Sequence, residues 1–345
     1  MKVLLTHERF APEFAGGGEY VALETARSLV AHGAHVRVVT TGDPDVTDYE
    51  GLETTRVPVH RYRFNLATKT IARHARDADV IHTFNYHACL PSLRAGKRLG
   101  KPVVCMTLGL FRDAWKEMRG PILGRFWMRW ERYVLTRPYT RTLFLSDYSR
   151  EHGVALGVSP DRALVNSPGI EIDRYRPAET KEDVVLFVGK YDVRKGVYDV
   201  VRAARAVPEA SFRLMGWGPQ ESALREQAPP NVEFVTFERG EKLRAAFAAA
   251  RIFILPSQAE TFGIALLEAM ASGCAIISTI PLEYEGVRIS AGNEPEMVHA
   301  VRRLWSDRTL TERMGRRNHQ LAQSYTWKRH ADRLMDLYRQ LLDGA

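Results

Sequence analysis

One stretch decides the fold of this chain: Leu255-Pro-Ser-Gln-Ala-Glu260-Thr-Phe-Gly-Ile-Ala-Leu-Leu-Glu268-Ala-Met-Ala-Ser-Gly273. The apolar residues 251–255 that lead into it are typical of a buried parallel strand, which Pro256 ends. Thr261 and Gly263 then open a predicted helix with one apolar stripe, formed by Ile264, Leu267, Met270 and Ala271. The stretch therefore predicts a loop at the carboxyl end of a strand that runs into a helix N-terminus. Free backbone N–H groups and the helix dipole favour an anion there.

Two carboxylates flank this predicted anion site, Glu260 in the loop and Glu268 two turns along the helix. A ligand with phosphate at one end and hydroxyls at the other, such as a nucleotide-sugar, fits this arrangement. The alternative is that both are solvated acids beside a helix, with Glu260 merely favouring the dipole. Spacing alone does not separate the two interpretations.

The complete string resembles the E-x7-E motif of the retaining family-4 glycosyltransferases, approximately P-S-x-x-E-x-F-G-x-x-x-x-E-A-M-A-x-G. The resemblance implies an α/β protein of the GT-B fold, with two doubly wound Rossmann-like domains facing each other across a cleft. It also implies that Glu260 is catalytic and holds the donor sugar. The donor would further be bound by Glu268 at its ribose and by the backbone N–H groups of Phe262, Gly263 and Ile264 at its diphosphate.

Alternating strands and helices extend along the whole chain, as in doubly wound folds. A composition of 45% hydrophobic and 26% charged residues over 345 residues suits a globular protein with two cores. We expect an N-terminal acceptor-side domain over residues 1–177, a nucleotide-sugar-binding domain over 178–322, and a C-terminal helix over 323–345 that returns to the first domain. The strands are expected at residues 2–6, 35–40, 79–82, 101–106, 141–145, 184–188, 211–215, 232–235, 251–255 and 275–278.

The boundary between the domains is expected near residues 168–177, Pro-Gly-Ile-Glu-Ile-Asp-Arg-Tyr-Arg-Pro. This segment is similar to the N-G-V-D-x-x-x-F-x-P segment of the same family, with Pro168 in place of the usual Asn. A polar linker follows it at residues 178–183.

Two further segments resemble donor-binding motifs of the family. Gly16-Gly17-Gly18 follows the first predicted strand, and in the family such a glycine pair lets backbone N–H groups approach the diphosphate; a flexible turn is the alternative. Lys190 and Lys195 lie in a segment similar to G-R-x-x-x-x-K-G, where two cations grip the diphosphate. The resemblance therefore assigns Gly16, Gly17, Lys190 and Lys195 to the donor, and Lys195 also to catalysis; the alternative for the lysines is a basic surface turn.

The acceptor pocket is expected in the first domain. His82 ends a strand and matches the first His of the family's D-V-V-H segment, His87 lies near it, and a satisfied core histidine is the competing interpretation. Leu108, beside Gly109, stands where the family often has a His that contacts the donor sugar. A leucine cannot donate or accept a hydrogen bond there. A second departure is the compressed loop at residues 281–286, which replaces a G-G-x-x-E loop.

Positive charge is concentrated in the first half of the chain. Residues 1–170 hold 24 Lys+Arg and 17 Asp+Glu, a net +7 of the total +8. Residues 112–141 combine this charge with Trp115, Phe126, Trp127, Trp130 and Tyr133, which predicts peripheral contact with an anionic membrane. The alternative is that the aromatic rings pack in the core while the arginines reach solvent. Nucleic acid is not expected, because no nucleic-acid-binding motif accompanies the charge.

Neither a metal nor another cofactor is expected, since the chain lacks D-x-D and a ligand-spaced His cluster. Cys89, Cys105 and Cys274 are too far apart for a CxxC motif and are predicted to be free thiols of a cytoplasmic protein. The prediction is an enzyme that moves a sugar from a nucleotide-sugar to an acceptor hydroxyl with retention of configuration. A sugar-nucleotide epimerase of the same fold, and a nucleotide-sugar-binding relative without catalysis, are the alternatives.

Overall fold

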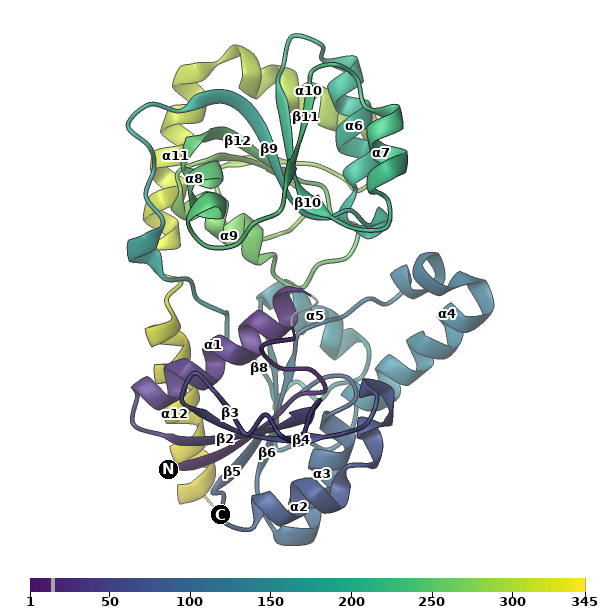
Figure 1. Ribbon diagram of the computed structural model, residues 1–345, viewed down its shortest axis with the longest axis vertical. Helices are drawn as coiled ribbons and strands as arrows, with labels where there is room; N and C mark the ends of the chain where they lie inside the picture. The colour runs from purple at the N-terminus through teal and green to yellow at the C-terminus, as the bar shows by residue number, and fades with distance from the viewer. Residues whose placement is uncertain (14–15, 345) are drawn as a thin grey trace. The chain divides into compact units, whose positions relative to one another are not determined.

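The computed structural model describes residues 1–13 and 16–344, which divide into two compact units (Figure 1). Unit 1 comprises residues 1–169 together with the C-terminal residues from Trp327 onward. Unit 2 is the continuous segment Ile170–Thr326.

Unit 1 is built on an eight-stranded sheet in the order β3-β4-β2-β1-β5-β6-β7-β8, in which β3 is antiparallel to β4 and every other pair is parallel. The central strands β1, β5 and β6 are buried along almost their whole length because helices cover the sheet. The strands are β1 (Lys2–Thr6), β2 (His35–Thr41), β3 (Asp48–Tyr49), β4 (Leu52–Val57), β5 (Val80–Phe84), β6 (Val103–Thr107), β7 (Arg141–Phe144) and β8 (Ala163–Val165).

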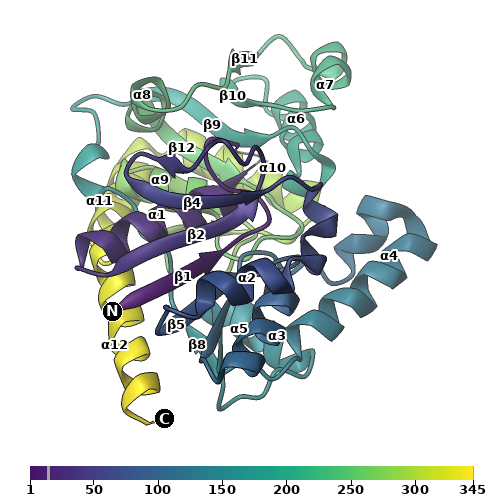
Figure 2. The same ribbon diagram turned by 60° about the horizontal axis from the view of Figure 1, so that its bottom comes forward.

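The helices of unit 1 follow its strands and cover the sheet (Figures 1 and 2). Helix α5 begins with a capping box: the Ser146 side chain accepts from Ser149 N at 3.2 Å, and the Ser149 side chain accepts from Ser146 N. The helical elements are α1 (Gly17–Ala31), η1 (Arg61–Leu66), α2 (Thr68–Ala75), α3 (Cys89–Leu99), α4 (Ala114–Leu135), α5 (Asp147–Ala155) and α12 (Trp327–Asp343).

Helix α12 belongs to the core of unit 1 although it is the last element of the chain. It packs against α1, where Thr25 Oγ1 lies 3.1 Å from His330 Nε2. The hydroxyl of Tyr338 reaches the sheet and lies 2.5 Å from Nδ1 of His82 in β5. The predicted C-terminal helix therefore completes the N-terminal unit.

Unit 2 is built on a six-stranded, wholly parallel sheet in the order β11-β10-β9-β12-β13-β14. Its strands are β9 (Glu182–Lys190), β10 (Phe212–Trp217), β11 (Val232–Thr236), β12 (Ala250–Leu255), β13 (Ala275–Ser278) and β14 (Gly286–Arg288). Its helical elements are η2 (Ile172–Arg174), η3 (Val193–Lys195), α6 (Val197–Ala206), α7 (Glu221–Gln227), α8 (Glu241–Ala249), α9 (Ile264–Ala271), α10 (Glu294–Ser306) and α11 (Arg308–Ala322).

Both sheets are doubly wound, with the strand order reversing beside the first strand of each unit. In unit 1 the chain proceeds from β1 outward through β2 and β4, and then returns to place β5 on the other side of β1. In unit 2 the same reversal occurs between β9 and β12. Ligands of such sheets bind at the carboxyl ends of the strands where the order reverses. The loops after β1, β5, β9 and β12 are therefore the places to look for a site.

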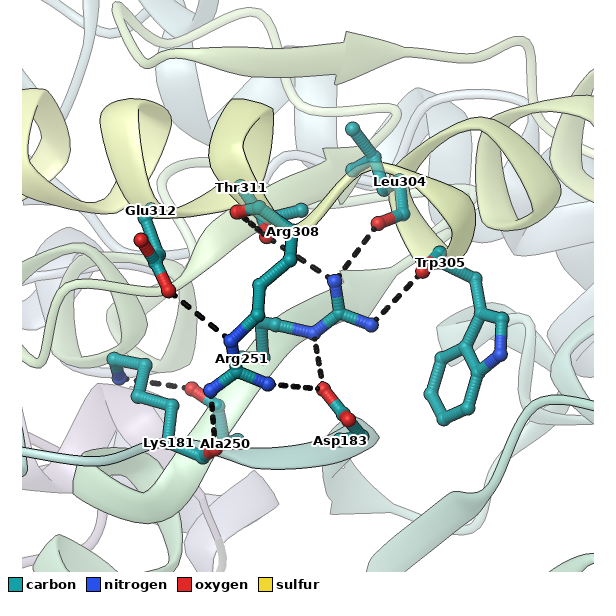
Figure 3. Close-up of polar contacts among 9 residues, drawn as sticks. All are labelled: Lys181, Asp183, Ala250, Arg251, Leu304, Trp305, Arg308, Thr311 and Glu312. Carbon is teal, nitrogen blue, oxygen red and sulfur yellow. Dashed lines mark hydrogen bonds and ion pairs between the residues drawn. The ribbon is translucent and has the colours of Figure 1, made fainter.

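A buried arginine, Arg251, joins helices to the amino ends of the strands in the unit 2 sheet (Figure 3). Arg251, near the start of β12, donates to the carbonyls of Leu304 and Trp305 at 3.2 and 3.0 Å and lies 2.9 Å from the Asp183 carboxylate of β9. Arg308 of α11 pairs with the same carboxylate at 2.8 Å. These contacts attach α10 and α11 to the amino ends of two central strands, because a buried guanidinium needs several acceptors.

A second cation, the half-buried Lys181, lies at the same end of the sheet (Figure 3). Its Nζ donates to the carbonyls of Ala248, Ala250 and Ser272 at 2.9, 2.8 and 2.7 Å. Burial lowers the pKa of Lys181, since no carboxylate lies among these three acceptors. The segment that was predicted to be a polar linker is thus bonded into unit 2.

The structure divides the chain earlier than the predicted boundary at residue 177. Residues 170–177 belong to unit 2, where Ile170 N donates to Tyr325 O at 3.1 Å and Tyr175 bonds to α9. The polar residues 178–183 suggested a linker at that point in the sequence. The two contacts described here place the preceding segment, residues 170–177, in unit 2.

Candidate functional site

The candidate site of unit 2 consists of the two loops at the point where its strand order reverses. Residues 191–196 follow β9 and residues 256–263 follow β12. The loops are joined by a hydrogen bond from Gln258 N to Arg194 O at 2.8 Å. Gly196 has a φ of +67°, and a Cβ at this position would overlap the carbonyl oxygen of Pro256. Only glycine lets the two backbones approach so closely.

The structure brings the predicted catalytic pair, Lys195 and Glu260, into direct contact. Nζ of Lys195, at the end of η3, forms an ion pair with Oε2 of Glu260. Both side chains are mostly but not fully buried. Neither is therefore the solvated surface charge of the alternative interpretation. Each side chain therefore compensates the charge of the other.

Helix α9 begins directly behind this ion pair. Its N-cap is Gly263, with a φ of +84°, where a Cβ would come within 2.7 Å of Ile280 Cδ1. The first helical N–H groups therefore open beside Lys195 and Glu260. Together the helix start and the lysine make this end of the loop positive, as an anionic ligand requires.

Helix α9 is not amphipathic, contrary to the prediction. Five apolar residues along it, Leu266, Leu267, Ala269, Met270 and Ala271, are all buried, because α8 and α11 pack on it in addition to the sheet. A helix that is apolar all round lies inside a protein. Its one acid is thus carried into the interior.

Glu268 is that acid, and it is buried. The Tyr175 hydroxyl donates to its Oε1 at 2.6 Å, and Tyr175 is itself buried. Burial raises the pKa of Glu268 to about 7, and the hydrogen bond from Tyr175 opposes part of this rise. A structural carboxylate is rarely kept half-protonated at neutral pH, so this group is a candidate for binding or catalysis.

Tyr175 was not identified from the sequence as a site residue. It occupies the Phe position of the N-G-V-D-x-x-x-F-x-P segment. The hydroxyl that distinguishes Tyr from Phe is the group that holds Glu268. This departure from the family pattern was visible in the sequence, but its partner lies 93 residues away and only the fold identifies it.

Lys190 is the last residue of β9 and stands beside Trp217 of β10. It therefore lies at the carboxyl edge of the sheet, on the same side as Lys195. Arg194 lies between the two lysines in sequence, but its guanidinium is held by Asp192 at 2.9 Å. Lys190 and Lys195 remain the cations assigned to the diphosphate.

Unit 1 has an equivalent site at its own reversal point, formed by the loops after β1 and β5. The Glu8 carboxylate faces the backbone N–H groups of Tyr86 and His87, at 3.5 and 3.4 Å. The ring of His87 is held by Asn65 at 2.9 Å, and burial lowers the pKa of His87. Glu8 was not identified from the sequence; its position directly after a central strand was the signal available.

His82 lies apart from this site. It is fully buried in β5, bonded to Tyr338, and burial lowers its pKa to about 3. The aromatic rings next to the His82 imidazole are those of Phe84 and Tyr338. This placement favours the core-histidine interpretation over the acceptor-pocket one.

Leu108 and Gly109 follow β6 and are held by one side chain. Oδ1 of Asn85 accepts from Leu108 N at 2.8 Å and from Gly109 N at 3.4 Å, while Nδ2 donates to Gly109 O at 2.7 Å. Leu108 approaches Gly18 at the start of α1, where a Cβ would lie 3.5 Å from Leu108 Cδ1. The leucine at the family's His position thus packs against the glycine-rich turn.

A buried carboxylate, Glu131 of α4, fixes the loop that follows Gly109. It accepts from the backbone N–H groups of Phe111 and Arg112 at 2.8 and 2.9 Å, and from the side chains of Tyr86 and Trp115 at 2.5 and 3.1 Å. Four donors satisfy an ionised carboxylate without a cation. No feature of the sequence distinguished Glu131 from the other acids.

Gly16 and Gly17 lie at the start of α1, where Gly16 is the N-cap and Gly17 the first helical residue. They belong to unit 1, whereas the other donor residues belong to unit 2. Their joint action on one donor stays a prediction. Phe14 and Ala15, in the middle of the predicted loop, lie outside the described residues.

Comparison with known families assigns both halves of the chain. Residues 15–174 match "Glycosyltransferase Family 4", and residues 182–307 match "Glycosyl transferases group 1". The chain belongs to the family-4, group 1 glycosyltransferases. It is therefore an enzyme that transfers sugars. A relative from Xanthomonas oryzae pv. oryzae, GDP-mannose:cellobiosyl-diphosphopolyprenol alpha-mannosyltransferase, is 28% identical over 81% of this chain and 79% of its own length.

Solved structures show the same GT-B fold. Sucrose-phosphate synthase from Thermosynechococcus elongatus superposes with a TM-score of 0.82 at 21% identity, over 100% of both chains. Anabaena HepE, solved in complex with UDP and glucose, superposes with a TM-score of 0.78 at 16% identity, over 98% of this chain and 99% of its own. The predicted fold class of two Rossmann-like parallel sheets is confirmed.

Two further observations concern ligands and surroundings. Within residues 1–13 and 16–344, no three His, Cys, Asp or Glu side chains are grouped so as to hold a metal ion. Over the same residues, no helix combines the length and apolar character that crossing a bilayer demands. Cys89, Cys105 and Cys274 are buried and free, as predicted.

Proposed function

We propose that this glycosyltransferase takes its sugar from a nucleotide-sugar and transfers it to an acceptor hydroxyl with retention of configuration. The observation that carries the proposal is the arrangement after β9 and β12. At this point, where doubly wound sheets bind nucleotides, lie the Lys195 ammonium and the N-terminus of α9. Two carboxylates lie there as well: Glu260, which is paired with Lys195, and Glu268, which is buried. The GDP-mannose in the name of the Xanthomonas relative supports a donor of this class.

Each end of the donor has a matching group in unit 2. The diphosphate is assigned to Lys190, Lys195 and the first N–H groups of α9, because these are the positive elements of the site. Glu268 lies about one turn past the first residue of α9 and is assigned to the ribose diol. Glu260, at the Lys195 end, is assigned to the donor sugar.

The chemistry follows from where charge develops. As the glycosidic bond breaks, negative charge grows on the departing diphosphate and positive charge on the sugar ring. Lys195 stabilises the first and Glu260 the second, so their mutual ion pair is replaced by two contacts to the transition state. No covalent nucleophile is assigned. The departing phosphate oxygen accepts the acceptor's proton on the same face, which gives retention.

Two experiments test this proposal. Thermal unfolding is measured with ADP, GDP, UDP and the matching nucleotide-sugars, since a ligand that binds only the folded state raises the melting temperature by mass action. The anomeric configuration of the product formed from the donor with the largest shift is then read by NMR. An inverted product refutes retention, and the absence of any nucleotide-dependent shift refutes the donor assignment.

The alternatives predict different outcomes in the same experiments. A binding-only relative shows the thermal shift but no transfer with a range of acceptors. An epimerase converts the nucleotide-sugar without an acceptor. The binding-only alternative rests on Leu108, which stands where the family often has a His that contacts the donor sugar.

A further inference from the structure

Helix α4 is a helical hairpin that projects from the sheet of unit 1 (Figures 1 and 2). Gly120, with φ 77° and ψ 170°, breaks the helix just before Pro121. The two halves then pack against each other, since a Cβ at Gly124 would lie 2.7 Å from Lys116 N. The stacked rings of Trp115 and Trp127, with centroids 5.4 Å apart, hold the halves together.

The turn and the outer face of this hairpin are apolar and exposed. Ile122 is 83% exposed, Leu123 56% and Phe126 58%. A fourth residue, Leu66 of η1, is 80% exposed. Among the described residues, α4 and η1 carry six of the ten large apolar side chains that are exposed, so the exposure is concentrated in these elements rather than scattered.

The two elements meet at the rings of Tyr62 and Trp127. The ring of Tyr62, in η1, lies 6.2 Å from that of Trp127 in α4, and the guanidinium of Arg61 lies 4.9 Å above the Tyr62 ring. We call this surface the tip patch. Its apolar members are Tyr62, Leu66, Ile122, Leu123 and Phe126.

Exposed arginines accompany these apolar residues from Arg119 onward, and the exposed acids of the hairpin, Asp113 and Glu117, precede them in sequence. Arg119, Arg125 and Arg129 are exposed and, among the described residues, form no ion pair with a carboxylate. The one acid between Met118 and Tyr139 is Glu131, which is buried and accepts from four donors inside the unit. The exposed charges of residues 119–138 are therefore all positive.

We propose that the tip patch docks on the surface of an anionic lipid bilayer. Ile122, Leu123 and Phe126 enter the boundary between headgroups and acyl chains, and the arginines bind lipid phosphates. The charge distribution selects this occupant, since a second copy of the chain would bring arginines against arginines. Exposed apolar residues at a turn, ringed by unpaired cations, are what an interfacial segment requires.

This surface explains the charge and aromatic content of residues 112–141 better than either alternative from the sequence alone. Trp115 is buried and Trp127 and Trp130 are half-buried, so the tryptophans do pack inward. Phe126 and Tyr133 are the exposed aromatic residues of the segment, and the aliphatic Ile122 and Leu123 are exposed as well. The docking residues thus share only Phe126 with the aromatic residues that first suggested a membrane.

The test is flotation of the full chain with phosphatidylcholine vesicles that contain or lack phosphatidylglycerol, at low and high salt. Binding is expected only with phosphatidylglycerol and is expected to weaken with salt. Each arginine near such a surface contributes roughly five-fold to partitioning, so R119Q/R125Q/R129Q is expected to lower it roughly 100-fold. The matched control R313Q/R316Q/R317Q removes the same charge from exposed positions of α11 and is expected to bind as wild type.

A second pair of variants separates insertion from simple charge attraction. I122S/F126S is expected to lose most binding, whereas V30S/L342S, which changes two exposed apolar residues elsewhere in unit 1, is expected to keep it. Unchanged melting temperatures show that all variants fold. Equal binding to both vesicle types, or equal loss in the two arginine triples, overturns the proposal. So does self-association in light scattering that I122S/F126S abolishes while vesicle binding is absent. None of these measurements depends on sugar transfer.

Discussion

Glu268 offers the sharpest test of the nucleotide site because its ionisation should control binding at neutral pH. Its pKa is raised from 4.5 to about 7, with burial as the largest cause. A ribose diol donates hydrogen bonds, so it prefers the ionised carboxylate. With a pKa near 7, about 10% of the group is ionised at pH 6 and about 90% at pH 8. Affinity for a nucleoside diphosphate should therefore rise about ten-fold between these values.

The variant Glu268→Gln supplies the reference. The amide does not titrate, so its affinity should be low and should change with pH only as the phosphates of the ligand titrate. The difference between wild type and variant, measured by titration calorimetry with UDP and GDP from pH 6 to 8, isolates Glu268. Glu260→Gln is the matched control: it should keep the pH dependence of wild type and damage sugar transfer instead.

The same pKa has a consequence for stability. The unfolded chain loses this proton near pH 4.5, whereas the folded protein keeps it until about pH 7. Stability should therefore fall as pH rises through this window, by about 3 kcal/mol relative to Glu268→Gln. Parallel pH profiles of wild type and Glu268→Gln, in both binding and urea unfolding, would refute the reasoning. Loss of diphosphate affinity in Glu260→Gln alone would reverse the assignment of the pair.

Four further outcomes are expected. Tyr175→Phe removes the hydrogen bond that opposes the rise in the Glu268 pKa, so the midpoint of pH-dependent nucleotide binding should move to higher pH; an unmoved midpoint contradicts the positioning role. Lys195→Ala should slow turnover by a factor equivalent to roughly 2–4 kcal/mol, and steady-state rates within a few-fold of wild type would exclude Lys195 from the site. Transfer should persist in a chelator, since the lysines supply the positive charge; activity lost in EDTA and restored by magnesium or manganese would disprove this. Gly196→Ala should weaken nucleotide binding and lower the melting temperature together, because its Cβ would force the two loops apart at Pro256, and a variant that behaves as wild type in both assays would show that the close approach is not required.

Much of the fold was predictable because strands of parallel sheets are apolar along their length. Residues 2–6 and 275–278 were predicted with the bounds that the structure shows, and the ten expected strands all exist. Four strands were missed: β3, β4, β8 and β14. Each of the four lies at or next to the edge of its sheet. Edge strands are short or partly exposed, so they lack the continuous apolar pattern that identifies central strands.

The site was predictable in its residue types but not in its contacts. Motif resemblance located Glu260, Glu268 and Lys195, and no sequence pattern showed that Lys195 pairs with Glu260. The burial of Glu268 depends on α8 and α11 covering α9 from both sides, which periodicity within one helix does not report. Its raised pKa, and the role of Tyr175, follow from that burial alone.

The placement of α12 in unit 1 has a consequence for how the protein is made. Residues 170–326 emerge from the ribosome as an uninterrupted stretch, and unit 2 has every strand it needs before translation ends. Synthesis of unit 1 begins before that of unit 2 but is completed after it. The surface of α1 and the ring of His82 gain their partners only when residues 327–343 have been made. During synthesis the N-terminal half is therefore the one that exposes an uncovered apolar face, and a message truncated after codon 326 would leave it so permanently. Nascent-chain proteolysis should find the later-made unit protected before the earlier one.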